Sequence, residues 1–321
     1  MIFMNKLYKI ACLFFGLMCC LFVNAQTDTS ISVHDPVIIR QDSTYYIFCT
    51  GFGISVFSST DMKNWKKEKP VFSTAPQWAV KDIPGFRGHI WAPAVSAFGK
   101  NTSAIGLATN KTLDSSDKNF NWIDHGKVIE SVPGRDMWNA IDPNLIYAEN
   151  EPWLTFGSFW NGIKLVKLDS SLTQPVEPEK WFTIASRPRN NILPDSVAGD
   201  AAIEGPFIFK KDNYYYLFVS FDYCCRGEKS TYKMMVGRSA NVYGPYVDKD
   251  GVPMNLGGGS LVLEGDKNWN GVGHNAVANF NGVDYLVFHG YDANDNGKPK
   301  LRIEKLNWFN GWPFIARQRN N

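Results

Sequence analysis

The sequence predicts an all-β fold, a five-bladed β-propeller whose second blade is incomplete. Three observations support this prediction. A similar unit recurs about every 50–70 residues, each unit contains short aromatic and β-branched segments bounded by turn residues, and a long amphipathic helix appears nowhere. Four short antiparallel strands repeated five times describe propeller blades. A parallel α/β fold is disfavoured because it needs helical crossovers, and a β-sandwich would not explain five similar openings.

Each predicted blade opens with a short polar-to-apolar segment. The openings are HDPVII at 34–39, WAPAV at 91–95, IDPNLIY at 141–147, EGPFIF at 204–209 and HNAVANF at 274–280. Proline holds the same place in the first four openings. We expect these segments to be the strands that line the propeller axis, with their first residues at the mouth of the channel.

The remaining strands follow each opening. Second strands are predicted at 43–50, 152–159, 213–221 and 283–290, third strands at 54–59, 103–109, 162–168, 233–239 and 301–306, and outer strands around 71–72, 127–129, 181–184, 261–263 and 312–315. The second unit departs from this pattern because residues 94–102 are too few for a turn and a whole middle strand. We therefore expect blade two to be damaged or rebuilt.

The first 25 residues read as a signal peptide. Two lysines precede an apolar run from Ile10 to Val23, and Val23-Asn24-Ala25 follows as a small-residue cleavage site. The run is short for a membrane span of about 20 residues. We expect a secreted or periplasmic monomer with no membrane span, in which residues 26–321 form one catalytic domain. A lipid anchor at Cys19 is less favoured, because Gly16-Leu17-Met18 fits a lipoprotein signal badly.

Charge and cysteine content narrow the function. Cleavage after Ala25 removes two lysines and no acidic residue, which leaves 31 of each sign. Because the mature chain has no net positive charge to attract a polyanion, nucleic acid and acidic polymers are disfavoured as partners. The 11 Trp and 13 Tyr suit stacking on sugar faces, although most should simply fill a β core. Zinc-type spacings are absent, and the neighbours Cys224 and Cys225 are compatible with either a vicinal disulfide or two buried thiols.

Three acids stand at blade openings and form the predicted catalytic group: Asp35, Asp142 and Glu204. On neighbouring inner strands they would point at one another, and like charges this close keep one carboxyl protonated while another stays ionised. Glycoside hydrolysis requires that combination of acid and base. Taken singly, each acid is equally compatible with turn capping. Their recurrence at blade openings favours the catalytic interpretation.

His274 opens the fifth unit and would face the same axis. Near several carboxylates it could hold a hydrated cation, most plausibly calcium, with water supplying most ligands. A lone histidine is more often a satisfied hydrogen-bonding residue, and that remains the alternative. For His34 and His89, which lie beside openings, we expect supporting hydrogen bonds.

Together these segments resemble glycoside hydrolase family 43, and within it the endo-α-1,5-L-arabinanases. The resemblance extends from about Val33 to Trp312. It is carried by nine motifs in family order, namely VHDPVI at 33–38, GHIWAP at 88–93, SAIGLAT at 103–109, WNAIDPNL at 138–145, GSFWNGI at 157–163, IEGPF at 203–207, DYCCRG at 222–227, VGHNAV at 272–277 and DANDNGKPKLRI at 292–303.

The resemblance implies a division of roles and a substrate. Asp35 would be the general base, Glu204 the general acid, and Asp142 the residue that raises the pKa of that acid and orients it, with inversion at the anomeric carbon. The substrate would be arabinan or arabino-oligosaccharides, and His274 would be the ligand of a central calcium ion. By the same match the sugar-contacting residues are Trp91, Phe98, Gly99, Asn139, Ala140, Ile141, Ser158, Phe159 and Trp160.

Two departures from the family pattern keep other functions open. Ala94 follows Trp-Ala-Pro where relatives carry aspartate, and a tyrosine-rich strand that relatives have before Phe98 is missing. An arabinan-binding propeller without turnover is therefore one alternative. An exo-acting arabinofuranosidase or β-xylosidase is another, because endo or exo action depends on loops that the sequence does not place.

Overall fold

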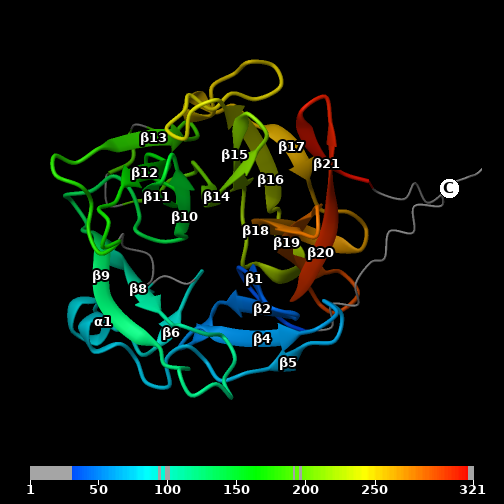
Figure 1. Cartoon of the computed structure of the whole chain (residues 1–321). Coiled ribbons are helices and arrows are strands. Elements are labelled where there is room, and N and C mark those ends of the chain that lie inside the picture. The colour runs from blue at the N-terminus through cyan, green and yellow to red at the C-terminus, as the bar shows by residue number, and fades with distance from the viewer. Residues whose placement is uncertain (1–30, 93–94, 98–101, 191, 195–196, 317–321) are drawn as a thin grey trace, which may run out of the picture.

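The computed structural model describes residues 31–92, 95–97, 102–190, 192–194 and 197–316. The described strands form four four-stranded antiparallel sheets, one three-stranded sheet and one two-stranded sheet. These sheets are arranged around a common centre, and the chain visits them in sequence order (Figure 1). The predicted all-β propeller arrangement is confirmed, with four complete blades among the described residues.

The blades are built from consecutive strands. The N-terminal blade contains β1 (Val37–Gln41), β2 (Thr44–Cys49), β4 (Ser55–Ser59) and β5 (Lys66–Lys67); the second complete blade contains β10 (Asn144–Ala148), β11 (Glu151–Phe156), β12 (Ile163–Lys167) and β13 (Trp181–Ala185). The third contains β14 (Ile203–Lys211), β15 (Tyr214–Phe221), β16 (Lys233–Ser239) and β17 (Ser260–Leu263), and the C-terminal blade contains β18 (Trp269–Phe280), β19 (Val283–Asp292), β20 (Lys298–Phe309) and β21 (Trp312–Ile315). In each blade the first strand is drawn nearest the centre in Figure 1.

The second sequence unit forms the three-stranded sheet, β7 (Val95–Ala97), β8 (Thr102–Thr109) and β9 (Ile123–Ser131). β7 pairs only with residues 102–104 of β8. Beside the remainder of β8 lies a cavity of about 280 Å³, lined by apolar residues of β1 and β2 and by Gly106 and Ala108. Among the described residues this sheet therefore has three strands where the complete blades have four, as expected from the short second unit.

Five short elements complete the described fold: the paired strands β3 (Gly51–Phe52) and β6 (His89–Ile90), helix α1 (Gln77–Asp82) and the 3₁₀ turns η1 (Gly227–Lys229) and η2 (Met254–Leu256). One outer strand was predicted wrongly. Residues 71–72 are not in a strand, and β5 forms instead at Lys66–Lys67. The amides of Val71 and Phe72 bond to the carbonyls of Ile54 and Gly53, so an apolar pair was mistaken for a strand edge.

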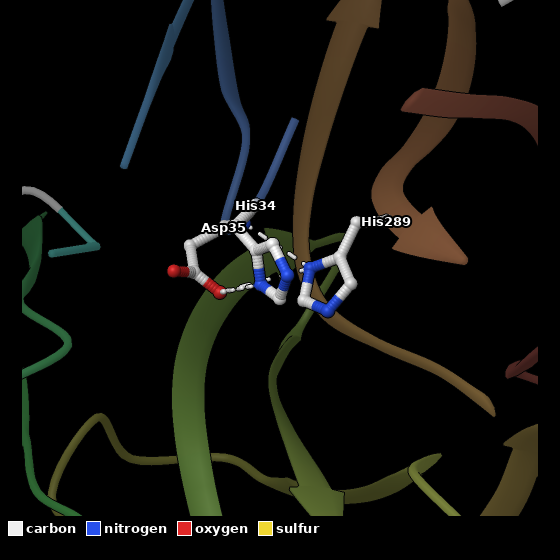
Figure 2. A group of neighbouring side chains, drawn as sticks. All are labelled: His34, Asp35 and His289. Carbon is white, nitrogen blue, oxygen red and sulfur yellow. Dashed lines mark hydrogen bonds and ion pairs between the residues drawn. The ribbon is translucent and has the colours of Figure 1, made fainter. Parts of the chain in front are cut away.

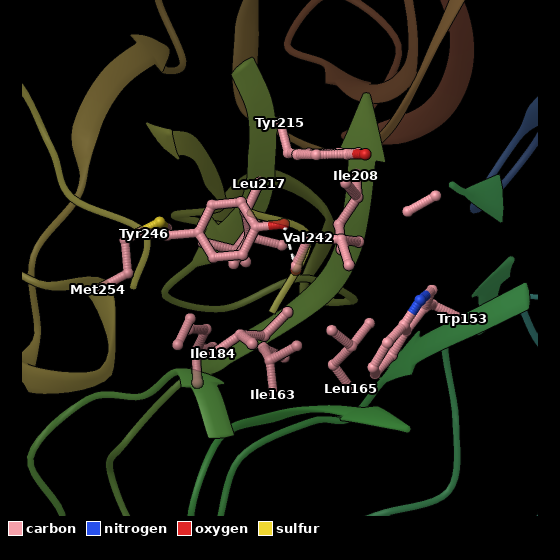
Figure 3. Packing of buried hydrophobic residues seen from close by; sticks show 14 of the residues in the cluster. Trp153, Ile163, Leu165, Ile184, Ile208, Tyr215, Leu217, Val242, Tyr246 and Met254 are labelled. Atoms are coloured by element: carbon pink, nitrogen blue, oxygen red, sulfur yellow. Dashed lines mark hydrogen bonds between the residues drawn. The ribbon is translucent and has the colours of Figure 1, made fainter. Parts of the chain in front are cut away.

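Apolar side chains fill the space between adjacent blades. The largest cluster joins the second and third complete blades and includes Ile163, Leu165, Leu217 and Met254 (Figure 3). Truncating one such aliphatic side chain to alanine costs about 2–5 kcal/mol in typical cores. This packing fixes the blades relative to one another and therefore fixes the residues at their inner ends.

Cys224 and Cys225 form a vicinal disulfide, while Cys49 is buried and free. This decides between the two alternatives left open by the sequence. Among the described residues no helix has the length and apolar character needed to cross a membrane. The predicted signal peptide at residues 1–25 lies outside the described residues.

Candidate active site

The three predicted carboxyl residues come from three blades and influence one another electrostatically. Asp35 precedes β1, Asp142 precedes β10 and Glu204 lies in β14. The charge of Asp35 raises the pKa values of both other acids, and all three acids raise the pKa of His274. The fold therefore gathers the three acids around the imidazole of His274.

An unusual backbone conformation presents these residues. Asp35, Asp142 and His274 have φ values of 54°, 58° and 52°. Such left-handed residues other than glycine cost about 1–3 kcal/mol and concentrate at functional sites. In the third complete blade the corresponding left-handed residue is Gly205, with φ of 57°.

Glu204 therefore stands one residue earlier than the other two acids, and the expectation of three equivalent positions holds only for Asp35 and Asp142. Glu204 is already part of β14, where it pairs with Ser220. The register then shifts between Glu204 and Phe207. This irregularity accommodates the offset of Glu204 from the start of the blade.

Hydrogen bonds between neighbouring blades hold the left-handed residues in place. Their backbone N–H groups donate to a side chain of the preceding blade: Ala92 to Thr50 Oγ1 (2.9 Å), Gly205 to Asp142 Oδ2 (3.0 Å), His274 to Ser220 Oγ (2.8 Å) and Asp35 to His289 Nδ1 (3.1 Å). The last of these bonds joins the N-terminal blade to the C-terminal blade. Each bond satisfies an amide that the strand ladder leaves without a partner.

Asp35 is held as a carboxylate. Its Oδ1 lies 3.1 Å from His274 Nδ1, and its Oδ2 accepts a hydrogen bond from Thr50 Oγ1 at 2.5 Å. Burial alone would raise the pKa of Asp35, but the charge and hydrogen bond of His274 lower that pKa well below its usual range. Asp35 is therefore ionised at neutral pH, as a general base must be.

Glu204 and Asp142 have the opposite tendency. Burial raises the pKa of Glu204, although hydrogen bonds from Tyr232 (2.8 Å to Oε1) and Ser158 (2.9 Å to Oε2) act against the rise. Burial and the charge of Glu204 raise the pKa of Asp142 to about 7, against the opposing charge of His274. The pair therefore retains a proton near neutral pH, because two buried neighbouring carboxyls cannot both ionise cheaply.

The predicted calcium ligand, His274, fits a metal-binding role by the chemistry of its ring. Its Nδ1 contacts Asp35 Oδ1, an arrangement in which neutral His274 keeps the lone pair of Nε2 for a ligand. Without a cation, the charges of Asp35 and Asp142 overcome burial and raise the pKa of His274 to about 9. A cation at Nε2 would therefore have to displace a proton.

A second group of possible metal ligands, His34, Asp35 and His289, lies close together (Figure 2). Nδ1 of His289 already accepts the backbone N–H of Asp35, and its Nε2 lies 3.3 Å from the hydroxyl of Tyr291. Both ring nitrogens of His289 are therefore in use, and His289 supports Asp35 through a hydrogen bond to its backbone. The expectation of a supporting hydrogen bond is confirmed for His89, whose Nδ1 accepts from Trp91 Nε1 at 2.8 Å. For His34 no such bond is seen among the described residues, because its Nδ1 lies 4.0 Å from Asp35 Oδ1 and its ring packs on that of His289 with centroids 4.4 Å apart.

The predicted sugar-contacting residues differ in their accessibility. Ser158 contacts Glu204, Asn139 accepts a hydrogen bond from Ser103, and Phe159 lies beside Tyr223. Ala140, Ile141 and Trp160 are buried, so a sugar can touch them only at the small surface they retain or after their neighbours move. Phe98 and Gly99 lie outside the described residues.

Sequence reasoning missed three residues that contact the acids: Thr50, Tyr232 and His289. Thr50 directly follows β2 and His289 lies in the last half of β19; both belong to second-strand segments that a repeat alignment would have compared. Tyr232 carried no such signal, because it precedes β16 and reaches Glu204 only through the folded chain. Its ring fits because Gly273 has no side chain, since a Cβ there would lie 2.2 Å from the ring.

Comparisons with known proteins identify the family of the chain. The model of "Glycosyl hydrolases family 43" matches residues 29–313. The chain is 50% identical to an extracellular exo-α-(1→5)-L-arabinofuranosidase of Cellvibrio japonicus (89% of this chain, 86% of the relative) and 42% identical to an extracellular endo-α-(1→5)-L-arabinanase of Bacillus subtilis (88% and 87%). A Cellvibrio cellulosa α-L-arabinanase solved with arabinohexaose superposes with a TM-score of 0.87 at 50% identity, covering 89% of this chain and 96% of that one. The chain therefore belongs to glycosyl hydrolase family 43.

Proposed function

We propose that this protein is a secreted or periplasmic hydrolase that cleaves α-1,5-L-arabinofuranosidic bonds of arabinan with inversion. The observation that carries the proposal is the contrast within one site between an ionised Asp35 and a Glu204 whose pKa is raised. Base and acid in one site are what an inverting glycosidase requires. The relatives named above supply the substrate class and the extracellular setting.

In the proposed reaction, Asp35 accepts a proton from a water molecule as that water attacks the anomeric carbon. Glu204 donates its proton to the glycosidic oxygen as the bond to the leaving sugar breaks. Asp142 raises the pKa of Glu204 and, through its bond to the N–H of Gly205, fixes the backbone next to the acid. After turnover the protons are reversed, so Asp35 must release a proton and Glu204 regain one before the next cycle.

We further propose that His274 holds a calcium ion through Nε2, with water supplying most other ligands. The bound ion would add positive charge at the centre of the acid group. It would also favour the ionised form of Asp35, which His274 already contacts. We also propose that the sheet β7–β8–β9 is the remaining blade of a five-bladed propeller, reduced by the loss of its middle strand.

Endo action is our first proposal for the mode of attack, as the sequence motifs imply. Exo action is the second candidate, and a specific observation favours it: identity to the relative named exo-acting is 50%, against 42% for the relative named endo-acting. The two differ in their products. Endo action on linear arabinan yields a ladder of oligosaccharides early, whereas exo action yields one short product from the start.

The test is incubation of the mature protein with linear arabinan, with product lengths followed over time. We expect arabino-oligosaccharides from the wild type and a loss of turnover of about 10²–10⁴-fold in Glu204→Gln, which is the typical contribution of general acid catalysis. Binding of arabinan by the wild type without release of reducing ends would refute the hydrolase proposal. That result would establish the non-catalytic binding protein instead.

A further inference from the structure

A short turn beside the candidate active site contains the vicinal disulfide. This disulfide turn comprises residues 222–231, between β15 and β16. Its ends are joined by a hydrogen bond from the Thr231 amide to the Tyr223 carbonyl at 2.9 Å. Gly297, on the β19–β20 loop, packs so tightly on the turn that a Cβ there would lie 2.2 Å from the Glu228 nitrogen. The turn therefore bridges the third complete blade and the C-terminal blade.

A chain of hydrogen bonds runs from the disulfide turn to the proposed base. The backbone N–H of Cys225 donates to the hydroxyl of Tyr291 at 2.7 Å. That hydroxyl lies 3.3 Å from Nε2 of His289, and Nδ1 of His289 accepts the backbone N–H of Asp35 at 3.1 Å. Tyr291 and His289 are both buried, with 1% and 0% of their surface exposed. Water therefore cannot easily replace a lost partner.

The direction of each bond fixes the tautomer of His289. Because the Asp35 amide can only donate, Nδ1 of His289 must be unprotonated. Burial lowers the pKa of His289 well below its usual value, so the ring is neutral and its single hydrogen is on Nε2. Nε2–H then donates to Tyr291, whose hydroxyl accepts from both His289 and Cys225. The backbone N–H of Cys225 and both ring nitrogens of His289 are thereby satisfied.

We propose that Tyr291 and His289 are positioning residues for Asp35 and that the Cys224–Cys225 disulfide keeps them in register. Asp35 is held in a left-handed conformation. The hydrogen bond from its backbone N–H to His289 is one of the contacts that keep the backbone from leaving this conformation. Loss of the disulfide would make the turn more mobile. The hydroxyl of Tyr291 would then lose its fixed position, and so would the imidazole of His289 that anchors Asp35. This inference rests on the proposed role of Asp35 as the base.

A phosphine reductant gives a clean perturbation. It breaks the S–S bond with one water molecule, forming two thiols and a phosphine oxide, so electrons and atoms balance. Cys49, the one further cysteine among the described residues, is buried, and burial raises its pKa to about 12. Reduction therefore acts on the Cys224–Cys225 bond. We expect kcat on linear arabino-oligosaccharides to fall about threefold, with KM within twofold, because misplacement of a reacting group lowers turnover more than binding.

Substitution tests the middle of the chain. Tyr291→Phe should lower kcat about tenfold and abolish the further effect of reduction, since its hydroxyl is the link between turn and imidazole. Tyr216→Phe is the matched control, because it removes a buried hydroxyl that donates to the Gly311 carbonyl at 2.7 Å, with Arg238 as its other neighbour, and takes no part in the chain to Asp35. A reduced wild type and a Tyr291→Phe variant that both keep kcat within twofold would overturn the inference.

Nitrogen NMR of histidine-labelled protein provides a readout that does not depend on turnover. His289 should show an unprotonated Nδ1 and a protonated Nε2 that do not titrate between pH 5 and 8, and Tyr291→Phe should shift the Nε2 resonance. Protonation of His289 at Nδ1 would contradict the proposed bond directions. If the oxidised wild type shows this tautomer but releases no sugar, the proposed function is refuted. If turnover is unchanged both by reduction and by Tyr291→Phe, only the present inference is refuted.

Discussion

Removal of one hydroxyl from the candidate site should change the pH dependence of turnover in a defined direction. Tyr232 donates to Glu204 Oε1 at 2.8 Å, and its side chain is 1% exposed. A donor to a carboxyl favours the ionised form of that carboxyl. Tyr232→Phe should therefore raise the pKa of Glu204 further and keep the acid protonated to higher pH. The alkaline limb of kcat should move upward.

The magnitude follows from the strength of the lost bond. A hydrogen bond to a charged group contributes about 1.5–3 kcal/mol, and 1.36 kcal/mol corresponds to one pKa unit. The site is buried, so solvent screening is small and the alkaline limb should shift by about 1–2 pH units. Because Glu204 and Asp142 interact strongly, the limb reports the pair rather than Glu204 alone. The variant should also lose about 1–3 kcal/mol of folding free energy, since Oε1 is left without this donor.

The assay is kcat against pH from 5 to 10 on a linear arabino-oligosaccharide. Tyr246→Phe is the matched control, because it removes a buried hydroxyl that bonds to the Val242 carbonyl at 2.7 Å. The control should lose stability without moving the pH profile. If Tyr232→Phe loses stability while its alkaline limb stays within 0.3 unit of the wild type, the reasoning about Glu204 is refuted.

Three further outcomes are expected. Gly273→Ala should displace the Tyr232 ring, because a Cβ would lie 2.2 Å from it, and should cost about 1–3 kcal/mol in a chemical denaturation series; an unchanged midpoint would contradict the packing. In the presence of a chelator, thermal stability should fall as pH rises from 6.5 toward 9, because the pKa of His274 is raised from 6.5 to about 9 in the folded protein and its protonation stabilises the fold below that range. His274→Gln should reduce this dependence of stability on pH. An equal dependence in both proteins would exclude His274 as its source. Removal of divalent cations by a chelator should lower the turnover of the wild type, and added calcium should restore it. His274→Ala should respond to neither treatment. A wild type that is fully active without divalent cations would refute the calcium proposal.

The sequence predicted the propeller and the acids because both are written into local patterns. The recurring openings and the proline that follows Asp35 and Asp142 marked where each blade begins, and most strands were placed within a few residues. The short second unit was visible as a deficit of residues before Ser103. The prediction of an outer strand at residues 71–72 was wrong, because this apolar pair forms hydrogen bonds to a turn rather than to a strand.

The supporting residues could not be predicted in the same way. Tyr232 reaches Glu204 from the connection between β15 and β16 of the same blade, and nothing in its own segment indicates that contact. His289 reaches Asp35 across the boundary between the C-terminal and N-terminal blades, and only a repeat alignment of second strands would have marked its position. The offset of Glu204 could have been seen in the sequence, because Pro36 and Pro143 directly follow Asp35 and Asp142 whereas Gly205 separates Glu204 from Pro206. The register shift inside β14 and the contact of Tyr232 with Glu204 needed coordinates.

The bond between the Asp35 amide and His289 spans 254 residues, and Leu301 N–H reaches the Ile31 carbonyl across the same seam. A chain is synthesised from its N-terminus. Asp35, the residue proposed to activate water, is therefore made early, whereas His289, its hydrogen-bond partner, is made only when most of the polypeptide is complete. Contacts so distant in sequence also form slowly. Hydrolysis should thus be among the last properties acquired on refolding, and a fragment that ends before β19 should be inactive even where its own blades are folded.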